Sequence, residues 1–240
     1  MTTQSDKAGL LFVFGEPGSL LSDAEFHDWY DNEHVPLRMA IPAFLSTSRW
    51  TATDDARPRF LATYDLASTD VLEQAPYNTF ASTRSPRETD VIRRVQLLDR
   101  RTYVALQPEF APVEGYDARE PGPCLVTMQI SIRPELEDEL NKWYDEEHIE
   151  LLSQVPGWRR SRRFVLQNAG PAKGTDAAAV ATKGTPPKYL AVHEWDSAAS
   201  FETEEFKKAT STPWRMRMFE SADVWDGRRW ELMRTWSQEG

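Results

Sequence analysis

Two histidines, His34 and His148, each end a six-residue motif that occurs twice in the chain. Residues 29–34 read WYDNEH and residues 143–148 read WYDEEH, an offset of 114 residues (148 − 34). An imidazole can take up or release a proton near neutral pH, which suits enolisation, aldol-type ring closure or decarboxylation of a keto acid. The repeated motif therefore predicts proton-transfer chemistry, in one copy or in both.

Aromatic and cationic residues accompany both histidines. Tryptophan and tyrosine rings can stack on a flat substrate, and an arginine can pair with a carboxylate or enolate through two hydrogen bonds. The candidate catalytic residues are His34 and His148, and the candidate substrate-binding residues are Trp29, Tyr30, Arg49, Trp143, Tyr144, Arg163 and His193. Structural roles are the alternative, because the tryptophans could pack in the core and the histidines could cap a helix end.

The acidic residues inside the motif have three interpretations. They form a solvated helix face, or they pair with Arg49 and Arg163; orientation of the histidine is the sharper alternative. His27 has Asn141 as its counterpart and is expected at the surface, whereas His193 becomes a second acid/base candidate if it points inward.

The elements that must position these residues follow the same order in both halves. Strands are expected at 10–14, 44–50, 59–64 and 95–106, with helices from 22 and from about 68. The second half has strands at 125–131, 158–166, 189–195 and 229–236, with helices from 134 and near 197–209. Pro36 is expected to end the first helix close to His34. The order β-α-β-β-α-β, found twice, is the ferredoxin-like plan of the α+β class.

The repeat also predicts the domain boundaries. We expect a first repeat at 1–106, a Pro-rich extended linker at 107–123, and a second repeat at 124–240. The offset between the copies rises to 129 (188 − 59) after a segment rich in Ala, Gly, Lys, Thr and Pro. That flexible insertion, 168–187, is expected to be a mobile loop or a lid. Each repeat has one bare sheet face, so two tandem copies are expected to form a pseudo-dimeric α+β barrel whose interior receives both histidines.

Composition narrows the class of protein. The net charge of −10 disfavours a nucleic-acid partner, which requires a basic face. Cys124 is the single cysteine, which fits a reducing compartment, and neither a signal-peptide pattern nor a membrane span is predicted, so a cytoplasmic location is expected. Nucleotide-binding loops and metal-ligand spacings are absent from the sequence, so no cofactor and no metal are predicted.

The chain resembles the dimeric α+β barrel superfamily, and its EthD-like branch in particular, as two fused copies. The resemblance rests on the repeated motif, on the segments 42–44 and 156–158 that follow it, and on Arg49 and Arg163. This superfamily includes polyketide cyclases, decarboxylases, muconolactone-type isomerases, cofactor-free anthrone monooxygenases and haem-using enzymes. In several members a helix-1 histidine facing the cavity transfers the proton, a role the resemblance implies for His34 and His148. His34, followed by Val-Pro, keeps the fuller motif and is favoured.

Together these features favour a cofactor-independent enzyme of the lyase, cyclase or isomerase type, acting in secondary metabolism on an aromatic or polyketide-like substrate. The first alternative is a cofactor-free monooxygenase of anthrone- or quinol-like compounds. The second is a non-catalytic protein that binds a hydrophobic ligand or serves in a stress response. Neither a nucleic acid nor a membrane is expected as partner, and assembly into a homodimer is left open.

Overall fold

The computed structural model describes residues 8–107, 109–181 and 184–238, which form two compact units. Unit 1 contains the described residues of 1–105, 166–186 and 233–240, and unit 2 contains those of 106–165 and 187–232. Both units combine an antiparallel sheet with helices, and the α+β class predicted from the sequence is confirmed.

Unit 1 follows the order strand, helix, strand, strand, helix, strand. Its elements are β1 (Gly9–Glu16), α1 (Asp23–Trp29), the π-helical turn η1 (Tyr30–His34), α2 (Val35–Met39), β2 (Phe44–Ala52), β3 (Phe60–Leu66), the 3-10 helices η2 (Thr69–Glu73) and η3 (Tyr77–Thr79), α3 (Pro86–Arg94), β4 (Leu97–Ala105) and α6 (Ala177–Ala181).

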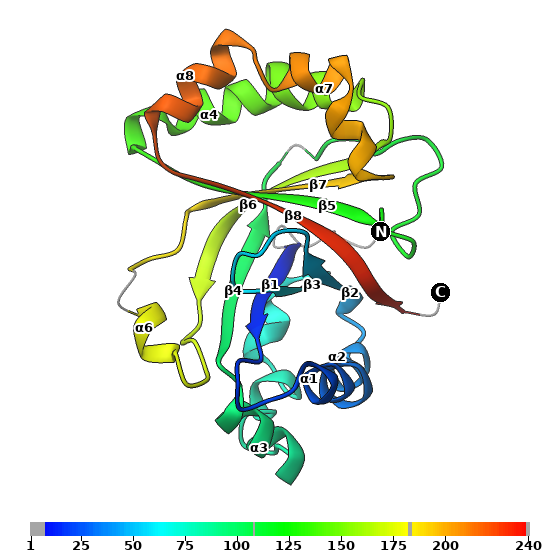
Figure 1. Ribbon diagram of the computed structural model, residues 1–240, viewed down its shortest axis with the longest axis vertical. Helices are drawn as coiled ribbons and strands as arrows, with labels where there is room; N and C mark the ends of the chain where they lie inside the picture. The colour runs from blue at the N-terminus through cyan, green and yellow to red at the C-terminus, as the bar shows by residue number, and fades with distance from the viewer. Residues whose placement is uncertain (1–7, 108, 182–183, 239–240) are drawn as a thin grey trace. The chain divides into compact units, whose positions relative to one another are not determined.

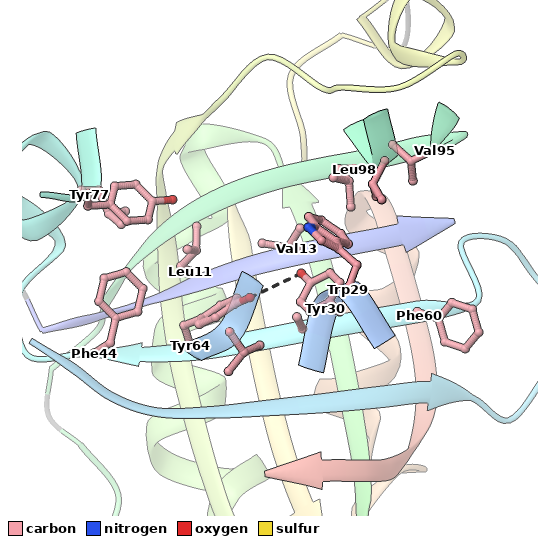
Figure 2. Packing of buried hydrophobic residues seen from close by; sticks show 14 of the residues in the cluster. Leu11, Val13, Trp29, Tyr30, Phe44, Phe60, Tyr64, Tyr77, Val95 and Leu98 are labelled. Atoms are coloured by element: carbon pink, nitrogen blue, oxygen red, sulfur yellow. Dashed lines mark hydrogen bonds between the residues drawn. The ribbon is translucent and has the colours of Figure 1, made fainter. Parts of the chain in front are cut away.

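The sheet of unit 1 has the order β4-β1-β3-β2, and α1, α2 and α3 lie along one face of it (Figure 1). Alternation along β1 directs Leu11 and Val13 toward the helices, where they pack with Trp29 and Tyr64 (Figure 2). Phe12 is also fully buried, against Tyr103 on the opposite face. Both faces of this sheet are therefore buried, which explains why residues 10–14 of β1 are all apolar in sequence.

Unit 2 repeats this order of strands, with the two α-helices α7 and α8 before its last strand. Its elements are β5 (Cys124–Ile132), the 3-10 helix η4 (Pro134–Leu136), α4 (Glu137–Trp143), the π-helical turn η5 (Tyr144–His148), α5 (Ile149–Ser153), β6 (Trp158–Ala169), β7 (Tyr189–Trp195), the 3-10 helix η6 (Ala198–Glu202), α7 (Glu204–Ala209), α8 (Pro213–Ser221) and β8 (Ala222–Ser237).

The sheet of unit 2 has the order β6-β7-β5-β8, with α4, α7 and α8 along one face (Figure 1). The registers of the two sheets correspond. Leu11 of β1 pairs with Tyr64 of β3, and Val126 of β5 pairs with His193 of β7. His193 therefore occupies in unit 2 the position that Tyr64 occupies in unit 1.

The prediction that Pro36 ends the first helix is wrong, because the helix continues through α2 to Met39. The backbone N–H of Val35 donates to the carbonyl of Tyr30, five residues back, so the hydrogen-bond register changes at this point. Pro36 lies in the first turn after that change, where a missing N–H is tolerated.

The segment after β6 lies along β4, in unit 1. Gly170 N–H donates to the carbonyl of Arg100, and Lys173 exchanges backbone hydrogen bonds with Leu98 in both directions, at 2.9 Å each. Backbone N–H and C=O groups along the edge of a strand need hydrogen-bond partners. This segment supplies such partners to Leu98 and Arg100 of β4. Composition alone does not reveal this pairing.

Candidate functional site

In each unit, a π-helical turn within the first helix positions the motif histidine. In both copies the five residues from the motif tyrosine to the motif histidine form a wide turn that closes with an N–H donating five residues back. The tyrosine and the histidine of each turn are both buried. Such turns insert one residue into a helix without breaking it, and they are frequent at functional sites.

The motif aspartate and the following arginine form an ion pair beneath each helix. Asp31 pairs with Arg49, and Asp145 pairs with Arg163 at 3.5 Å. Each guanidinium also lies over the ring of the motif tyrosine, at 4.4 Å for Arg49 and 4.2 Å for Arg163. The structure thus has the predicted pairing of the motif aspartates with Arg49 and Arg163, and the two arginines connect the helix to the sheet.

The motif glutamate anchors the next helix. Ser85 caps the N-terminus of α3 and donates its hydroxyl to Glu33, and Thr212 caps α8 and donates to Glu147 at 2.6 Å. Each glutamate thus fixes a helix start beside the histidine turn, as a helix-capping contact does.

Unit 1 contains a pocket of about 490 Å³ on the helix-covered face of its sheet. The pocket collects aromatic and aliphatic residues with a group of charged ones. Its lining comprises Leu11, Val13, His34, Arg38, Tyr64, Leu72, Glu73, Tyr77, Asn78, Phe80, Ala81, Arg84, Glu88, Ile92, Leu98, Arg100, Pro171 and Lys173.

His34 and Glu88 form a buried pair in this pocket. The His34 Nδ1 lies 3.0 Å from Glu88 Oε1. An ionised carboxylate accepts but cannot donate, so this contact assigns the histidine proton to Nδ1 and leaves the lone pair on Nε2. A carboxylate that fixes the tautomer and orientation of a histidine is the arrangement by which general bases are prepared. Arg38 holds the same turn by donating to the His34 carbonyl at 2.7 Å.

The electrostatics of the pocket keep this histidine neutral. Burial, with Arg38 nearby, lowers the pKa of His34 to about 3, although Glu88 acts in the opposite direction. Burial raises the pKa of Glu88, but the hydrogen bond with His34 and the charge of Arg38 outweigh it, and the net shift is downward. At neutral pH the pair is a neutral imidazole and a carboxylate.

Four cationic side chains line the same pocket: Arg38, Arg84, Arg100 and Lys173. Burial and the three arginines lower the pKa of Lys173. Mutual repulsion of this kind is relieved when an anion binds among the cations. The pocket is thus prepared for an acidic ligand, and its aromatic members Tyr64, Tyr77 and Phe80 can contact a flat one.

Unit 2 has a pocket of about 420 Å³ at the equivalent place. Its lining also mixes aromatic rings with cations, without a carboxylate among the described residues. The lining comprises Val126, Met128, Tyr144, His148, Leu152, His193, Phe206, Thr210, Arg215, Phe219, Trp225, Gly227, Arg228 and Arg229.

His148 stacks on Trp143, with ring centroids 4.3 Å apart, and lies 6.2 Å from the ring of His193. The His193 Nδ1 is 2.8 Å from Ser161 Oγ, which accepts from Trp158. Burial lowers the pKa of His148 well below its usual value, with His193 and Arg215 adding to the effect. Burial likewise lowers the pKa of His193 to about 4.

The partner of the histidine differs between the units. Ser85-Pro86 begins α3 and Thr212-Pro213 begins α8, and the third residue after the cap is Glu88 in one helix and Arg215 in the other. Unit 2 therefore has an arginine where unit 1 has the carboxylate.

The structure divides the predicted site residues into three groups. His34 lines the pocket of unit 1, and Tyr144, His148 and His193 line that of unit 2. Trp29 and Trp143 are fully buried in the two cores. Tyr30, Arg49 and Arg163 lie in the helix–sheet contact, outside the described lining of either pocket. His27, expected at the surface, is half-buried against Phe60 and lies 2.7 Å from Arg49.

The prediction that both histidines point into one shared interior is wrong. Each lies on the helix-covered face of its own unit, because a side chain on the covering helix cannot reach through the sheet to the opposite face. The sequence reasoning also missed the residues that give each pocket its charge, above all Glu88, Lys173 and Arg215. Alignment of the two copies on the Ser-Pro and Thr-Pro helix starts would have revealed the exchange of Glu88 for Arg215.

In the described part of the chain, no cluster of three or more histidine, cysteine, aspartate or glutamate residues could hold a metal ion. Within the same residues, no helix has the length and hydrophobicity needed to cross a membrane.

Comparisons with known proteins show the fold. No family model matches the chain, and no curated protein matches it significantly. An anthrone oxidase-like protein is similar in structure, with a TM-score of 0.63 at 15% identity over 99% of this chain and 95% of that one. A putative monooxygenase from Fusobacterium nucleatum has a TM-score of 0.56 at 12% identity over 98% and 96%. A chlorite dismutase variant from Candidatus Nitrospira defluvii has a TM-score of 0.56 at 9% identity over 95% and 92%. The chain thus shares its ferredoxin-like α+β fold with these proteins.

Proposed function

We propose that the pocket of unit 1 is the active site of an enzyme that abstracts a proton from an acidic aromatic or polyketide-like substrate. His34 is the general base and Glu88 its positioning residue. The contact of 3.0 Å between His34 Nδ1 and Glu88 is the observation that carries this proposal. The pocket volume of about 490 Å³ accommodates a compound of a few fused rings.

The proposed step begins with a carbon-bound proton that is acidified by a neighbouring carbonyl group. His34 Nε2 takes this proton, and the electron pair of the C–H bond moves onto the carbonyl oxygen, which forms an enolate. Arg38, Arg84, Arg100 and Lys173 supply positive charge around that oxygen and around an acidic group of the substrate. The imidazolium then returns the proton.

The site of proton return distinguishes the possible reactions. Return to another carbon is an isomerisation, whereas attack of the enolate carbon on a second carbonyl of the substrate is a cyclisation, with the proton delivered to the new alkoxide. Decarboxylation needs a proton donor at the outset. With a pKa lowered to about 3, His34 is unprotonated at neutral pH and has no proton to donate at the outset, which favours the first two reactions.

A cofactor-free monooxygenase is the second candidate function, because its first step is the same proton abstraction. The enolate would then react with molecular oxygen, which serves as the oxidant. Similarity to an anthrone oxidase-like protein supports this candidate. A third candidate, a protein that binds an acidic aromatic ligand without turnover, needs the cations but not the His34–Glu88 pair.

We also propose that the chain is a tandem fusion of two copies of one ferredoxin-like unit, with boundaries at 106 and 124, arranged as a pseudo-dimeric barrel of the EthD-like type. The paired π-helical turns, the paired helix caps and the matching registers of β1–β3 and β5–β7 support common origin. Assembly of two such chains into a homodimer is a prediction that analytical ultracentrifugation tests.

The proposed function can be tested by incubating the protein with an anthrone carboxylate in deuterium oxide. Without oxygen, proton NMR measures exchange of the acidic ring hydrogens, and in air an oxygen electrode measures consumption. Catalysed exchange supports proton abstraction, and oxygen uptake at a similar rate identifies the monooxygenase. Saturable binding without exchange would assign the protein to the ligand-binding class.

A further inference from the structure

The pocket of unit 2 contains polar atoms whose counterparts in unit 1 are hydrogen-bonded. The Tyr144 hydroxyl, His148 Nδ1 and His193 Nε2 are buried and have no hydrogen-bond partner among the residues that the structure describes, and all three residues line the cavity of about 420 Å³. In unit 1 the Tyr30 hydroxyl accepts from Tyr64, and His34 Nδ1 donates to Glu88 (Figure 2 shows the tyrosine pair). Buried polar groups are normally satisfied, so three unsatisfied ones around one cavity indicate a missing partner.

Two of these three atoms, the Tyr144 hydroxyl and His193 Nε2, can donate a hydrogen bond to an acceptor. Burial raises the pKa of Tyr144 to about 12, so its hydroxyl keeps its proton. Ser161 Oγ accepts from Trp158 and can donate its own proton to His193 Nδ1, and in that tautomer the histidine proton is on Nε2. A tyrosine O–H and an imidazole N–H can therefore both donate to the same ligand.

The charge of the lining has the same sign throughout. Arg215, Arg228 and Arg229 line the cavity, and no carboxylate belongs to its described lining. Burial lowers the pKa of Arg215, a cost that a bound anion offsets. Phe206, Phe219 and Trp225 supply ring faces for a flat molecule.

We propose that the pocket of unit 2 is a second binding site, which holds a planar aromatic carboxylate without catalysing its reaction. The Tyr144 hydroxyl, His193 Nε2 and Arg215 bind the carboxylate, and the aromatic residues contact the rings. This site has Arg215 at the position of Glu88, so no carboxylate at that position orients a general base. We therefore expect the site to bind the aromatic carboxylate without converting it. This site is independent of the reaction proposed for unit 1.

Titration with 2-naphthoate tests the proposal on the full chain labelled with 5-fluorotryptophan. Trp225 lines the pocket, and its fluorine resonance, assigned with Trp225→Phe, reports binding at this site alone. We expect the resonance to shift in a saturable manner with 2-naphthoate, and 2-naphthamide to bind at least about tenfold more weakly because it lacks the charge.

Arg215→Met should weaken 2-naphthoate binding at this resonance by about tenfold or more, and Arg215→Lys should restore part of the affinity. Arg217→Met is the matched control, because Arg217 lies on the same helix but is exposed and lies outside the lining. Circular dichroism of each variant establishes that it is folded. An unmoved Trp225 resonance, equal binding of the amide, or equal losses in Arg215→Met and Arg217→Met would overturn the proposal.

Discussion

The two units have nearly the same motif but different environments for its histidine. In unit 1, His34 donates to Glu88 in a pocket that mixes both charges, whereas in unit 2 His148 lies beside His193 and Arg215 with no carboxylate in the described lining. The aspartate and the second acidic residue of the motif make the same architectural contacts in both copies: Asp31 and Asp145 each pair with an arginine, and Glu33 and Glu147 each accept from the residue that caps the next helix. Repetition of the motif thus marks architecture, and the residues that differ between the copies determine the chemistry.

The largest expected difference between the units concerns catalysis. His34→Ala should reduce anaerobic exchange of an anthrone carboxylate by 10²- to 10⁴-fold, because it removes the general base. His148→Ala should reduce it by less than about tenfold. Proton NMR of both variants, with equal circular dichroism spectra, measures the difference. Equal losses in the two variants would mean that both units, or neither, carry the reaction.

The next largest expected effect is the loss of stability in acid that comes from the additional buried histidine of unit 2. His193 replaces Tyr64, and its folded-state pKa of about 4 lies below the usual 6.5. The unfolded chain then binds the proton more readily, so the free energy of unfolding falls as the pH drops from 6.5 toward 4, by about 3 kcal/mol for this group.

His193→Gln should remove that part of the pH dependence, since glutamine does not titrate. Urea unfolding at pH 6.5 and pH 4 measures it in the variant and in the parent chain. Identical falls in both would show that His193 is not held neutral in the folded state.

Glu88→Gln should lower the exchange rate by 10- to 100-fold, because an amide no longer fixes the histidine proton on Nδ1. Asp90→Asn is the matched control: Asp90 lies on the same helix, is partly exposed, lies outside the described pocket lining and pairs with Arg93 and Arg94. If the control loses as much activity as Glu88→Gln, the effect comes from the helix and not from the carboxylate beside His34.

The smallest expected effects concern the helix caps. Ser85→Ala and Thr212→Ala should each reduce the free energy of unfolding by about 1 kcal/mol, since each removes an equivalent capping contact. Ser85→Ala should also lower the exchange rate more than Thr212→Ala, because α3 carries Glu88. Chemical denaturation and the NMR assay measure the two quantities, and an opposite order in the rates would contradict the assignment of the site to unit 1.

The elements were predictable where local signals were strong. The apolar run of β1, the capping serine at residue 22 and the repeated motif led to the right elements in the right order. The π-helical turns were not predictable, because a wide turn leaves no mark in hydrophobic spacing. The position of Lys173 was also hidden, because only tertiary pairing with β4 brings that polar segment to the pocket. Glu88 was hidden by its distance of 54 positions from His34.

The tautomer of His34 tests the central claim most directly. The chain has four histidines, so long-range proton–nitrogen NMR of protein labelled with ¹⁵N-histidine can resolve each ring, with His34→Ala for assignment. We predict that at pH 7 His34 carries its proton on Nδ1, that it stays neutral down to about pH 5, and that Glu88→Gln changes the tautomer. A proton on Nε2, or titration of His34 near pH 6.5, would contradict the account.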